Sequence, residues 1–179
     1  MSVICVYCAS GTGVGQEYLD LAATLGTAIG SAGHTLVSGG GNVSMMGSVA
    51  AATRAAGGRT VGIIPRALMD REVADLDADE LVITETMRER KRLMDESADG
   101  FIALPGGIGT LEELFETWTG GFLGMHAKPV VLLDPSGFYT PLLSWLQDLV
   151  APGFVAQSSL DRLVVTETVE GALRHATDR

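Results

Sequence analysis

Short apolar runs alternate with longer amphipathic segments along most of this chain. The apolar runs lie at residues 3–9, 34–38, 60–64, 80–84, 101–104, 129–133 and 163–166, and each predicts a β-strand. The segments that predict helices are 17–32, with small residues along one side, 44–56, 86–98, a helix beginning at Thr110, 138–149 and 169–177. Gly33, Gly57 and Pro65 stand where elements are expected to end.

Strands that alternate with helices and are apolar throughout are typical of a parallel sheet buried on both faces. We therefore expect an α/β fold, a doubly wound, Rossmann-like and mainly parallel sheet with helices on both faces, formed by residues 1–179 as a single domain. In such folds ligands bind outside the carboxyl ends of the strands, near the reversal of strand order. The charged segment 66–79 is expected to cover a cleft.

The segment 101–119 carries the clearest functional signal. A buried strand at 101–104 is followed by Pro-Gly-Gly-Ile-Gly at 105–109, whose glycines permit a tight turn and a close backbone approach. Thr110 is the expected N-cap of the next helix, and Glu113 stands at capping-box spacing from it. The N–H groups at such a helix start suit a phosphate, although the loop matches neither a Walker A loop nor a GxGxxG fingerprint.

Acid–base candidates are limited to carboxylates near the glycine loops. Glu113, Glu112 and Glu72 qualify, and Glu113 has two interpretations, a helix cap or a catalytic group. The three histidines suggest no Ser-His-Asp arrangement, and no metal-ligand spacing appears. Cys5 and Cys8 have C-x-x-C spacing but lie in an apolar run, so buried structural thiols are expected rather than a redox or zinc pair.

Basic residues gather in one helix of an otherwise acidic chain. Four of the twelve Lys and Arg residues are Arg88, Arg90, Lys91 and Arg92, while the net charge is −10. Helical spacing puts Arg88, Lys91 and Arg92 on one side and Arg90 elsewhere. These residues either form a solvated face or, in a sharper interpretation, Arg90 and Lys91 face the loop at 105–110 and hold a phosphate or ribose oxygen.

Charge and hydropathy argue against several partner classes. The negative net charge argues against nucleic-acid partners and an anionic-membrane surface, and no apolar run approaches the roughly 20 residues of a membrane span. The N-terminal segment lacks a basic stretch and a signal-peptide core, so a cytoplasmic protein is expected. The 46% hydrophobic content is high for a soluble chain of this size and suggests burial in an oligomer interface.

Three motifs together resemble the Lonely Guy (LOG) family, the cytokinin riboside 5′-monophosphate phosphoribohydrolases. They are Ser-Gly-Gly-Gly-Asn-Val-Ser-Met-Met-Gly at 38–47, Met-Arg-Glu-Arg-Lys at 87–91 and Pro-Gly-Gly-Ile-Gly-Thr-Leu-Glu-Glu at 105–113. The last matches the family pattern PGGxGTxxE in full, and the similarity runs from about residue 3 to 134. Such proteins often carry a lysine decarboxylase label, for which no lysine stands in a suitable pyridoxal-phosphate setting.

The resemblance implies hydrolysis of the N-glycosidic bond of cytokinin (N6-modified adenine) riboside 5′-monophosphates. It places the catalytic roles on Arg90 and Glu113 and requires no metal or organic cofactor. It implies a nucleoside 5′-monophosphate as the substrate and a homodimer with the basic helix near the interface. The implied substrate-binding residues are Ser10, Gly40, Gly41, Glu72, Met87, Lys91, Gly106, Gly107, Ile108, Gly109, Thr110 and Thr119.

Two departures from the family pattern affect base specificity more than hydrolysis. Arg88 replaces the usual His, and Gly120 and Phe122 stand where an aromatic residue and an amide are usual. Two alternatives remain beside the phosphoribohydrolase: a binding module of the same fold, such as a molybdenum-cofactor carrier or nucleotide sensor, and a nucleosidase acting on AMP. The pairing of Arg90 with Glu113 favours an enzyme, because a carboxylate contributes nothing to a pure phosphate site.

Overall fold

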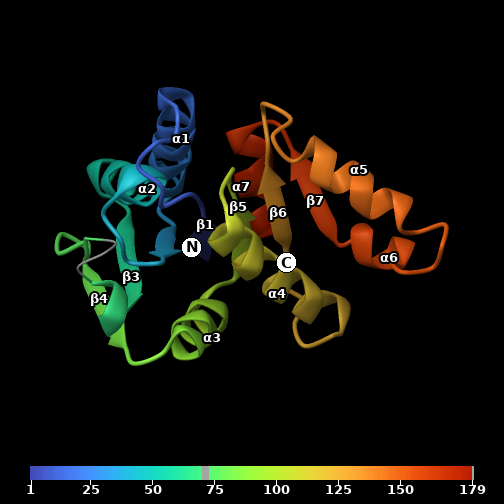
Figure 1. Cartoon of the computed structure of the whole chain (residues 1–179). Coiled ribbons are helices and arrows are strands. Elements are labelled where there is room, and N and C mark those ends of the chain that lie inside the picture. The colour runs from blue at the N-terminus through green and yellow to red at the C-terminus, as the bar shows by residue number, and fades with distance from the viewer. Residues whose placement is uncertain (70–72, 179) are drawn as a thin grey trace.

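A seven-stranded parallel sheet forms the centre of the molecule in the computed structural model, which describes residues 1–69 and 73–178 (Figure 1). The strands are β1 Val3–Tyr7, β2 Thr35–Ser38, β3 Arg59–Pro65, β4 Glu80–Thr84, β5 Gly100–Ala103, β6 Val130–Leu133 and β7 Leu163–Thr166. Their order is β4-β3-β2-β1-β5-β6-β7, and every neighbouring pair is parallel. The doubly wound α/β fold predicted from the sequence is confirmed.

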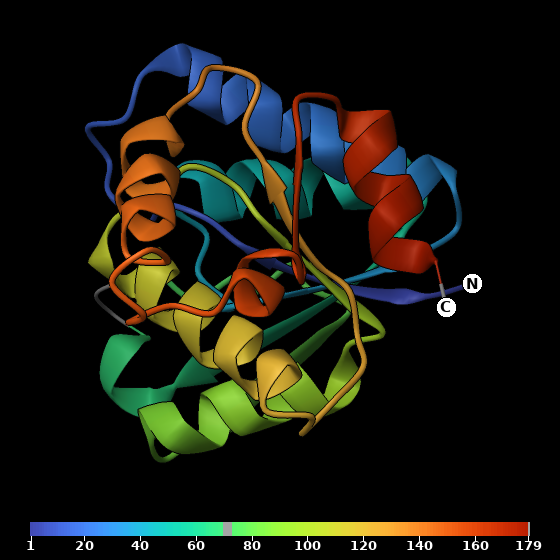
Figure 2. The ribbon, with the colours of Figure 1, turned by 90° about the vertical axis from the view of Figure 1, so that its right-hand side faces the viewer.

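Helices cover both faces of this sheet (Figure 2). They are α1 Gln16–Ser31, α2 Ser44–Ala55, α3 Met87–Ser97, α4 Ile108–Phe122, α5 Thr140–Asp148, α6 Gln157–Leu160 and α7 Val169–Thr177, with a 3-10 turn η1 at Arg66–Leu68. Helices α1, α2 and α7 enclose one apolar cluster against the sheet, and α3 to α6 enclose the other. No helix in the described ranges has the length and apolar character needed to cross a bilayer.

The strand order reverses beside β1. From β1 the chain proceeds outward through β2 and β3 to β4, and it then returns to β5 on the other side of β1. The loops that follow β1 and β5 consequently open at the same place on the carboxyl edge of the sheet, which is where ligands bind in folds of this kind. Cys5 and Cys8 are buried, free thiols at this central strand, as predicted.

The small residues along one side of α1 let it pack very closely on α2. A Cβ atom on Gly26 would lie 2.3 Å from the Val49 carbonyl oxygen, and one on Gly30 would lie 2.4 Å from the Thr53 carbonyl oxygen. Because glycine has no Cβ atom, the backbones of the two helices can approach this closely, and a larger residue at either position would collide. This contact fixes α2, and with it the loop that joins β2 to α2, against the sheet.

The predicted start of the helix after β5 is wrong. Helix α4 begins at Ile108 with Gly107 as its N-cap, so Thr110 lies inside the first turn and Glu113 is not part of a capping box. A capping arrangement exists instead at α3. There the Thr86 hydroxyl accepts from the Glu89 N–H at 3.1 Å, and the Glu89 carboxylate accepts from the Glu85 N–H at 2.9 Å.

The glycine loop after β2 is held by backbone pairing with a distant segment. Gly41 and Ala74 form an isolated antiparallel bridge, and the Asp75 N–H donates to the Gly40 carbonyl oxygen at 2.9 Å. The Asp75 carboxylate is buried and pairs with Arg54 of α2 at 2.7 Å. The charged segment after β3 thus secures the loop that precedes α2.

Candidate active site

A cavity of about 410 Å³ opens where the loops after β1 and β5 meet. Its walls come from the segment after β1, from α2 and α3, from the end of η1, and from the first turns of α4. They are formed by Cys8, Ala9, Ser10, Gly11, Val14, Met46, Leu68, Met87, Arg90, Gly107, Ile108, Gly109, Thr110, Glu112 and Glu113. The position agrees with the site expected from the strand order.

The phosphate loop, defined here as residues 105–110, leads from β5 into α4. Gly107 caps the helix without a side-chain hydrogen bond, and the first amide bonded within the helix is that of Leu111, which donates to the Gly107 carbonyl oxygen at 3.0 Å. The N–H groups of residues 108–110 are thus not used by intrahelical bonds. Together with the helix dipole they make an anion site at the cavity wall.

Thr110 and Gly106 set the shape of this loop. The Thr110 side chain is buried and lies so close to Gly106 that a Cβ atom there would be 2.1 Å from the Thr110 Oγ1 atom. A hydroxyl folded back on its own loop cannot cap the helix from outside. The same threonine therefore closes the turn rather than starting the helix.

Arg90 brings a buried positive charge to the cavity. The residue lies one turn into α3 and is only 4% exposed. Its Nη2 atom donates to the Gly39 carbonyl oxygen at 3.0 Å, and its Nη1 atom lies 3.8 Å from the Met87 sulfur. A Cβ atom on Gly39 would be 1.9 Å from Nη2, so the guanidinium occupies the space that a larger residue would fill.

Glu113 lines the same cavity from the second turn of α4. Its negative charge reaches the end of β1. Burial raises the pKa of the Cys8 thiol, and the Glu113 charge raises that pKa further. The carboxylate therefore sets a negative field at the floor of the cavity, which is the field that stabilises a developing positive charge.

A second cavity, of about 240 Å³, shares Glu113 with the first. It lies between α3 and α4 and is lined by Tyr7, Arg88, Lys91, Arg92, Asp95, Glu113, Glu116, Thr117, Gly120, Met125 and His126. Arg88, Lys91 and Arg92 line it together while Arg90 lies on the other cavity, so the predicted division of the basic cluster is confirmed.

Lys91 is engaged by carboxylates of α4. Its Nζ atom pairs with Glu112 and Glu116, and these bonds raise the pKa of Lys91 in spite of burial, which acts in the opposite direction. Of the two basic residues expected to face the phosphate loop, the cavity beside the loop therefore contains Arg90 and not Lys91.

Comparison with known proteins places the chain in a family. A family model described as "Possible lysine decarboxylase" matches residues 46–176. A cytokinin riboside 5′-monophosphate phosphoribohydrolase from Mycobacterium tuberculosis is 53% identical over 171 residues, which cover 96% of this chain and 91% of the relative. The rice protein cytokinin riboside 5′-monophosphate phosphoribohydrolase LOG is 46% identical over 156 residues, which cover 87% of this chain and 64% of the relative. The chain belongs to the LOG family.

Solved structures share the fold of this LOG family member at lower identity. The molybdenum cofactor carrier protein of Chlamydomonas reinhardtii is 22% identical with a TM-score of 0.72, and the two chains match over 97% and 94% of their lengths. The molybdenum cofactor binding protein of Rippkaea orientalis is 26% identical with a TM-score of 0.70, over 97% and 93%. The first of these supports the fold alone.

The structure brings most of the site residues predicted for a LOG protein to one cavity. Arg90 and Glu113 line it together, and so do the predicted binding residues Ser10, Met87, Gly107, Ile108, Gly109 and Thr110. Cys8, Ala9, Gly11, Val14, Met46, Leu68 and Glu112 also line it and were not among the predicted contacts. The position of residues 8–11 at the end of the central strand was a signal that would have indicated Cys8, Ala9 and Gly11.

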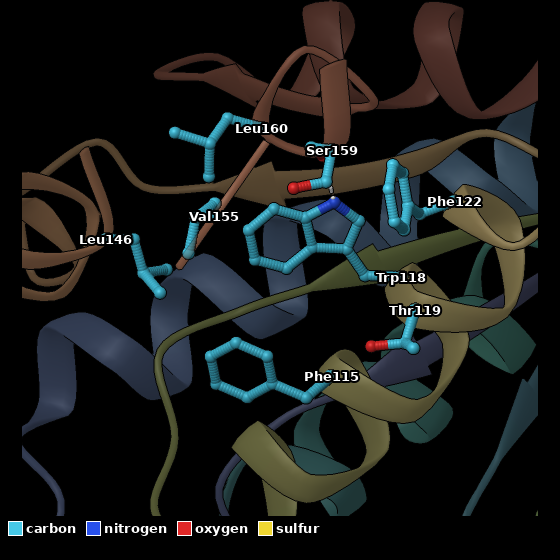
Figure 3. A pocket seen from close by; sticks show the side chains of 8 residues that line it. All are labelled: Phe115, Trp118, Thr119, Phe122, Leu146, Val155, Ser159 and Leu160. Atoms are coloured by element: carbon cyan, nitrogen blue, oxygen red, sulfur yellow. Dashed lines mark hydrogen bonds between the residues drawn. The ribbon is translucent and has the colours of Figure 1, made fainter. Parts of the chain in front are cut away.

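Other predicted residues lie elsewhere. Gly40 and Gly41 belong to the loop that carries the Gly39 carbonyl group, and Gly106 packs on Thr110. Thr119 lines a separate apolar cavity of about 170 Å³ between α4, α5 and α6 (Figure 3). In that cavity the Trp118 indole N–H donates to the Ser159 carbonyl oxygen at 2.6 Å. Glu72 lies outside the described residues.

The described residues give no support to a decarboxylase chemistry that depends on a lysine. The chain has two lysines, and neither Lys91 nor Lys128 lines the cavity. Lys128 lies 5.7 Å from the centre of the Phe101 ring and 3.7 Å from an Asp95 carboxylate oxygen. A pyridoxal cofactor needs a cavity lysine for its Schiff base. No group of three His, Cys, Asp or Glu among the residues described is placed to hold a metal ion.

The Gly39→Ala substitution tests the placement of Arg90. The new methyl group displaces the guanidinium, because its carbon would lie 1.9 Å from Nη2. Loss of one charged hydrogen-bonding group is expected to weaken binding of inorganic phosphate at least about tenfold, measured by calorimetry. Gly13→Ala is the matched control, since nothing lies within 4 Å of a Cβ atom there. Equal phosphate affinity in both variants would contradict the assignment.

Proposed function

We propose that this chain hydrolyses the N-glycosidic bond of cytokinin riboside 5′-monophosphates and releases the N6-modified adenine and ribose 5-phosphate. The observation that carries the proposal is the meeting of Arg90, Glu113 and the unbonded amides of α4 in one cavity. The relatives named for this activity match nearly the whole chain, which supports the same substrate class.

The phosphate loop and Arg90 bind the 5′-phosphate in this scheme. The amides of residues 108–110 donate to the phosphate oxygens, and the helix dipole favours their negative charge. Arg90 adds a buried guanidinium that is already oriented by the Gly39 carbonyl oxygen. Binding energy from this remote group then holds the ribose in a fixed position relative to Glu113.

Glu113 acts at the anomeric carbon. As the bond between C1′ and the base nitrogen breaks, the electron pair leaves with the base and positive charge develops on the ribose ring. The carboxylate stabilises this charge and accepts a proton from water, whose oxygen bonds to C1′. The departing base takes up a proton, so the sum of the reaction is addition of one water. We assign no step to a metal or an organic cofactor.

One alternative function receives less support, and a second is separated by experiment. A molybdenum-cofactor carrier shares the fold, but the molybdenum-cofactor proteins compared are 22–26% identical while the phosphoribohydrolase relative is 53% identical. A carboxylate beside an anion site also favours hydrolysis over simple anion binding. AMP differs from a cytokinin nucleotide only at N6, so the phosphate and ribose contacts proposed here serve both substrates. A comparison of turnover on AMP and on a cytokinin nucleotide distinguishes the two activities.

The deciding experiment compares isopentenyladenosine monophosphate, AMP and the unphosphorylated isopentenyl riboside as substrates, with released base measured by chromatography. Because the phosphate anchors the substrate, both nucleotides with the 5′-phosphate are candidates for cleavage, while the riboside is expected to show at least about 100-fold lower kcat/KM. Faster release from the modified nucleotide than from AMP supports the cytokinin assignment. Equal turnover of the nucleotide and its riboside would remove the phosphate-anchor mechanism.

Replacing Glu113 separates catalysis from stability. Gln has nearly the same shape and helix propensity, so Glu113→Gln is expected to change the free energy of unfolding by no more than about 1 kcal/mol. It cannot accept a proton from water, and turnover should fall at least about 100-fold. Arg90→Ala should also lower kcat/KM sharply, by weakening phosphate binding. The control is Glu96→Gln, which removes an exposed carboxylate from α3 and is expected to leave the rate of nucleotide hydrolysis unchanged. A fully active Glu113→Gln protein would leave the mechanism without its base.

We also propose a cytoplasmic homodimer. Two buried, free cysteines suit a reducing compartment. The face of β1 to β4 beside α3 carries a groove of about 390 Å³ whose lining includes the apolar residues Val61, Val82 and Leu93 and also the Arg59–Glu80 ion pair. A second copy covering this groove would account for the apolar excess of the chain and would place the basic helix at the interface.

The dimer proposal predicts that Val82→Asp produces monomers at micromolar concentration, because an unpaired charge would be buried in the interface. Light scattering measures the mass of the species in solution. The same change at Val165, on the opposite edge strand, is the control and should leave the dimer intact. A monomeric wild-type protein, or a dimeric Val82→Asp variant, would contradict the proposed interface.

A further inference from the structure

A buried tyrosine far along the chain holds the phosphate loop from behind. Tyr139 follows β6 and is 2% exposed. Its hydroxyl donates to the Leu104 carbonyl oxygen at 2.7 Å. The backbone N–H of Gly106 faces the same phenol and acts to lower its pKa. One hydroxyl group is therefore bonded to the residue before Pro105 and lies close to the residue after it.

This bridge lies where the backbone has few other partners. Strand β5 ends at Ala103, and Pro105 has no N–H to offer. The Leu104 N–H donates to the Tyr7 carbonyl oxygen at 2.9 Å, which attaches the start of the loop to β1. The phenol bonds the Leu104 carbonyl group, so it helps to fix the direction in which the chain enters α4.

Tyr139 is itself held rigidly. The Asp134 carboxylate is buried at the end of β6 and accepts from the Tyr139 N–H and the Phe138 N–H, each at 2.8 Å. The Phe138 and Tyr139 rings are packed edge to face with centroids 4.9 Å apart. Burial raises the pKa of the Tyr139 phenol, and the Asp134 charge raises it further, so the hydroxyl keeps the proton that it donates.

We propose that Tyr139 is a positioning residue for the phosphate loop, acting through the Leu104 carbonyl oxygen to aim the amides of residues 108–110 at the phosphate. Tyr139 does not line the cavity and acts only through this backbone. The proposal rests on the proposed function, because it assigns the loop to the substrate phosphate. Without the Tyr139 hydroxyl the phosphate loop would still form, but the amides of residues 108–110 would be less well aligned.

The test replaces Tyr139 by Phe, which keeps the ring and removes the hydroxyl. Affinity for ribose 5-phosphate, measured by calorimetry, is expected to fall about tenfold, the scale of one or two lost hydrogen bonds. KM for the nucleotide should rise by a similar factor while kcat stays within about threefold, since phosphate contacts stabilise ground and transition states alike. Replacing Tyr139 with 4-aminophenylalanine, which again presents a donor to Leu104, should restore most of the affinity.

Tyr18→Phe is the matched control. It removes the phenol hydroxyl of a residue whose ring also packs edge to face on Phe138, with centroids 6.1 Å apart, and that hydroxyl makes no hydrogen bond with another described residue. Its affinity and KM should equal those of the wild type. If Tyr139→Phe fails to fold, Asp134→Asn, which keeps the phenol but weakens its anchor, should give a threefold or greater loss of affinity, about 0.7 kcal/mol or more.

The outcomes separate this proposal from the proposed function. A lower melting temperature with unchanged KM and unchanged ribose 5-phosphate affinity would show that Tyr139 is merely structural and would overturn the inference, while hydrolysis by the wild type stands. A wild-type protein that neither cleaves the nucleotide nor binds ribose 5-phosphate would overturn both. A selective rise in KM that 4-aminophenylalanine reverses supports the positioning role.

Discussion

The start of α4 is the constraint on which the rest of the site depends. A helix that begins at Ile108 behind two glycines leaves its first amides without side-chain partners, and such amides need water or an anion. The surroundings favour the anion, because Arg90 is the buried guanidinium beside them. The reversal of strand order at β1 and β5 brings these groups together although they come from opposite halves of the sheet.

The charged groups near the phosphate loop are held in different ways. Lys91 pairs with Glu112 and Glu116 of α4; Glu112 lines the first cavity and Glu116 the second, while Glu113 lines both. Arg90 is oriented by the Gly39 carbonyl oxygen. In the proposed mechanism a cation serves the phosphate and a carboxylate serves the ribose ring, as hydrolysis through an oxocarbenium-like state requires.

Sequence periodicity predicted the sheet, the two glycine loops and the cavity, because these follow from apolar runs and glycine placement. The cap at Thr110 was wrong for a physical reason. The pattern Thr-x-x-Glu occurs at both 86–89 and 110–113, and only the first caps a helix, since Thr110 is packed against Gly106 inside its own turn. Spacing alone does not encode that tertiary contact. The Tyr139 bridge is likewise absent from local pattern, because it joins residues 35 apart.

The departures from the family pattern lie outside the cavity that contains the phosphate loop and Arg90. Arg88 and Gly120 line the second cavity, and Phe122 lines the apolar cavity between α4, α5 and α6. A Cβ atom on Gly120 would meet the His126 ring at 3.5 Å and the Met125 sulfur at 4.0 Å, which is ordinary contact, so the missing side chain leaves space there. Among their lining residues the first and second cavities share only Glu113, so sequence change at these three positions leaves the anion site untouched.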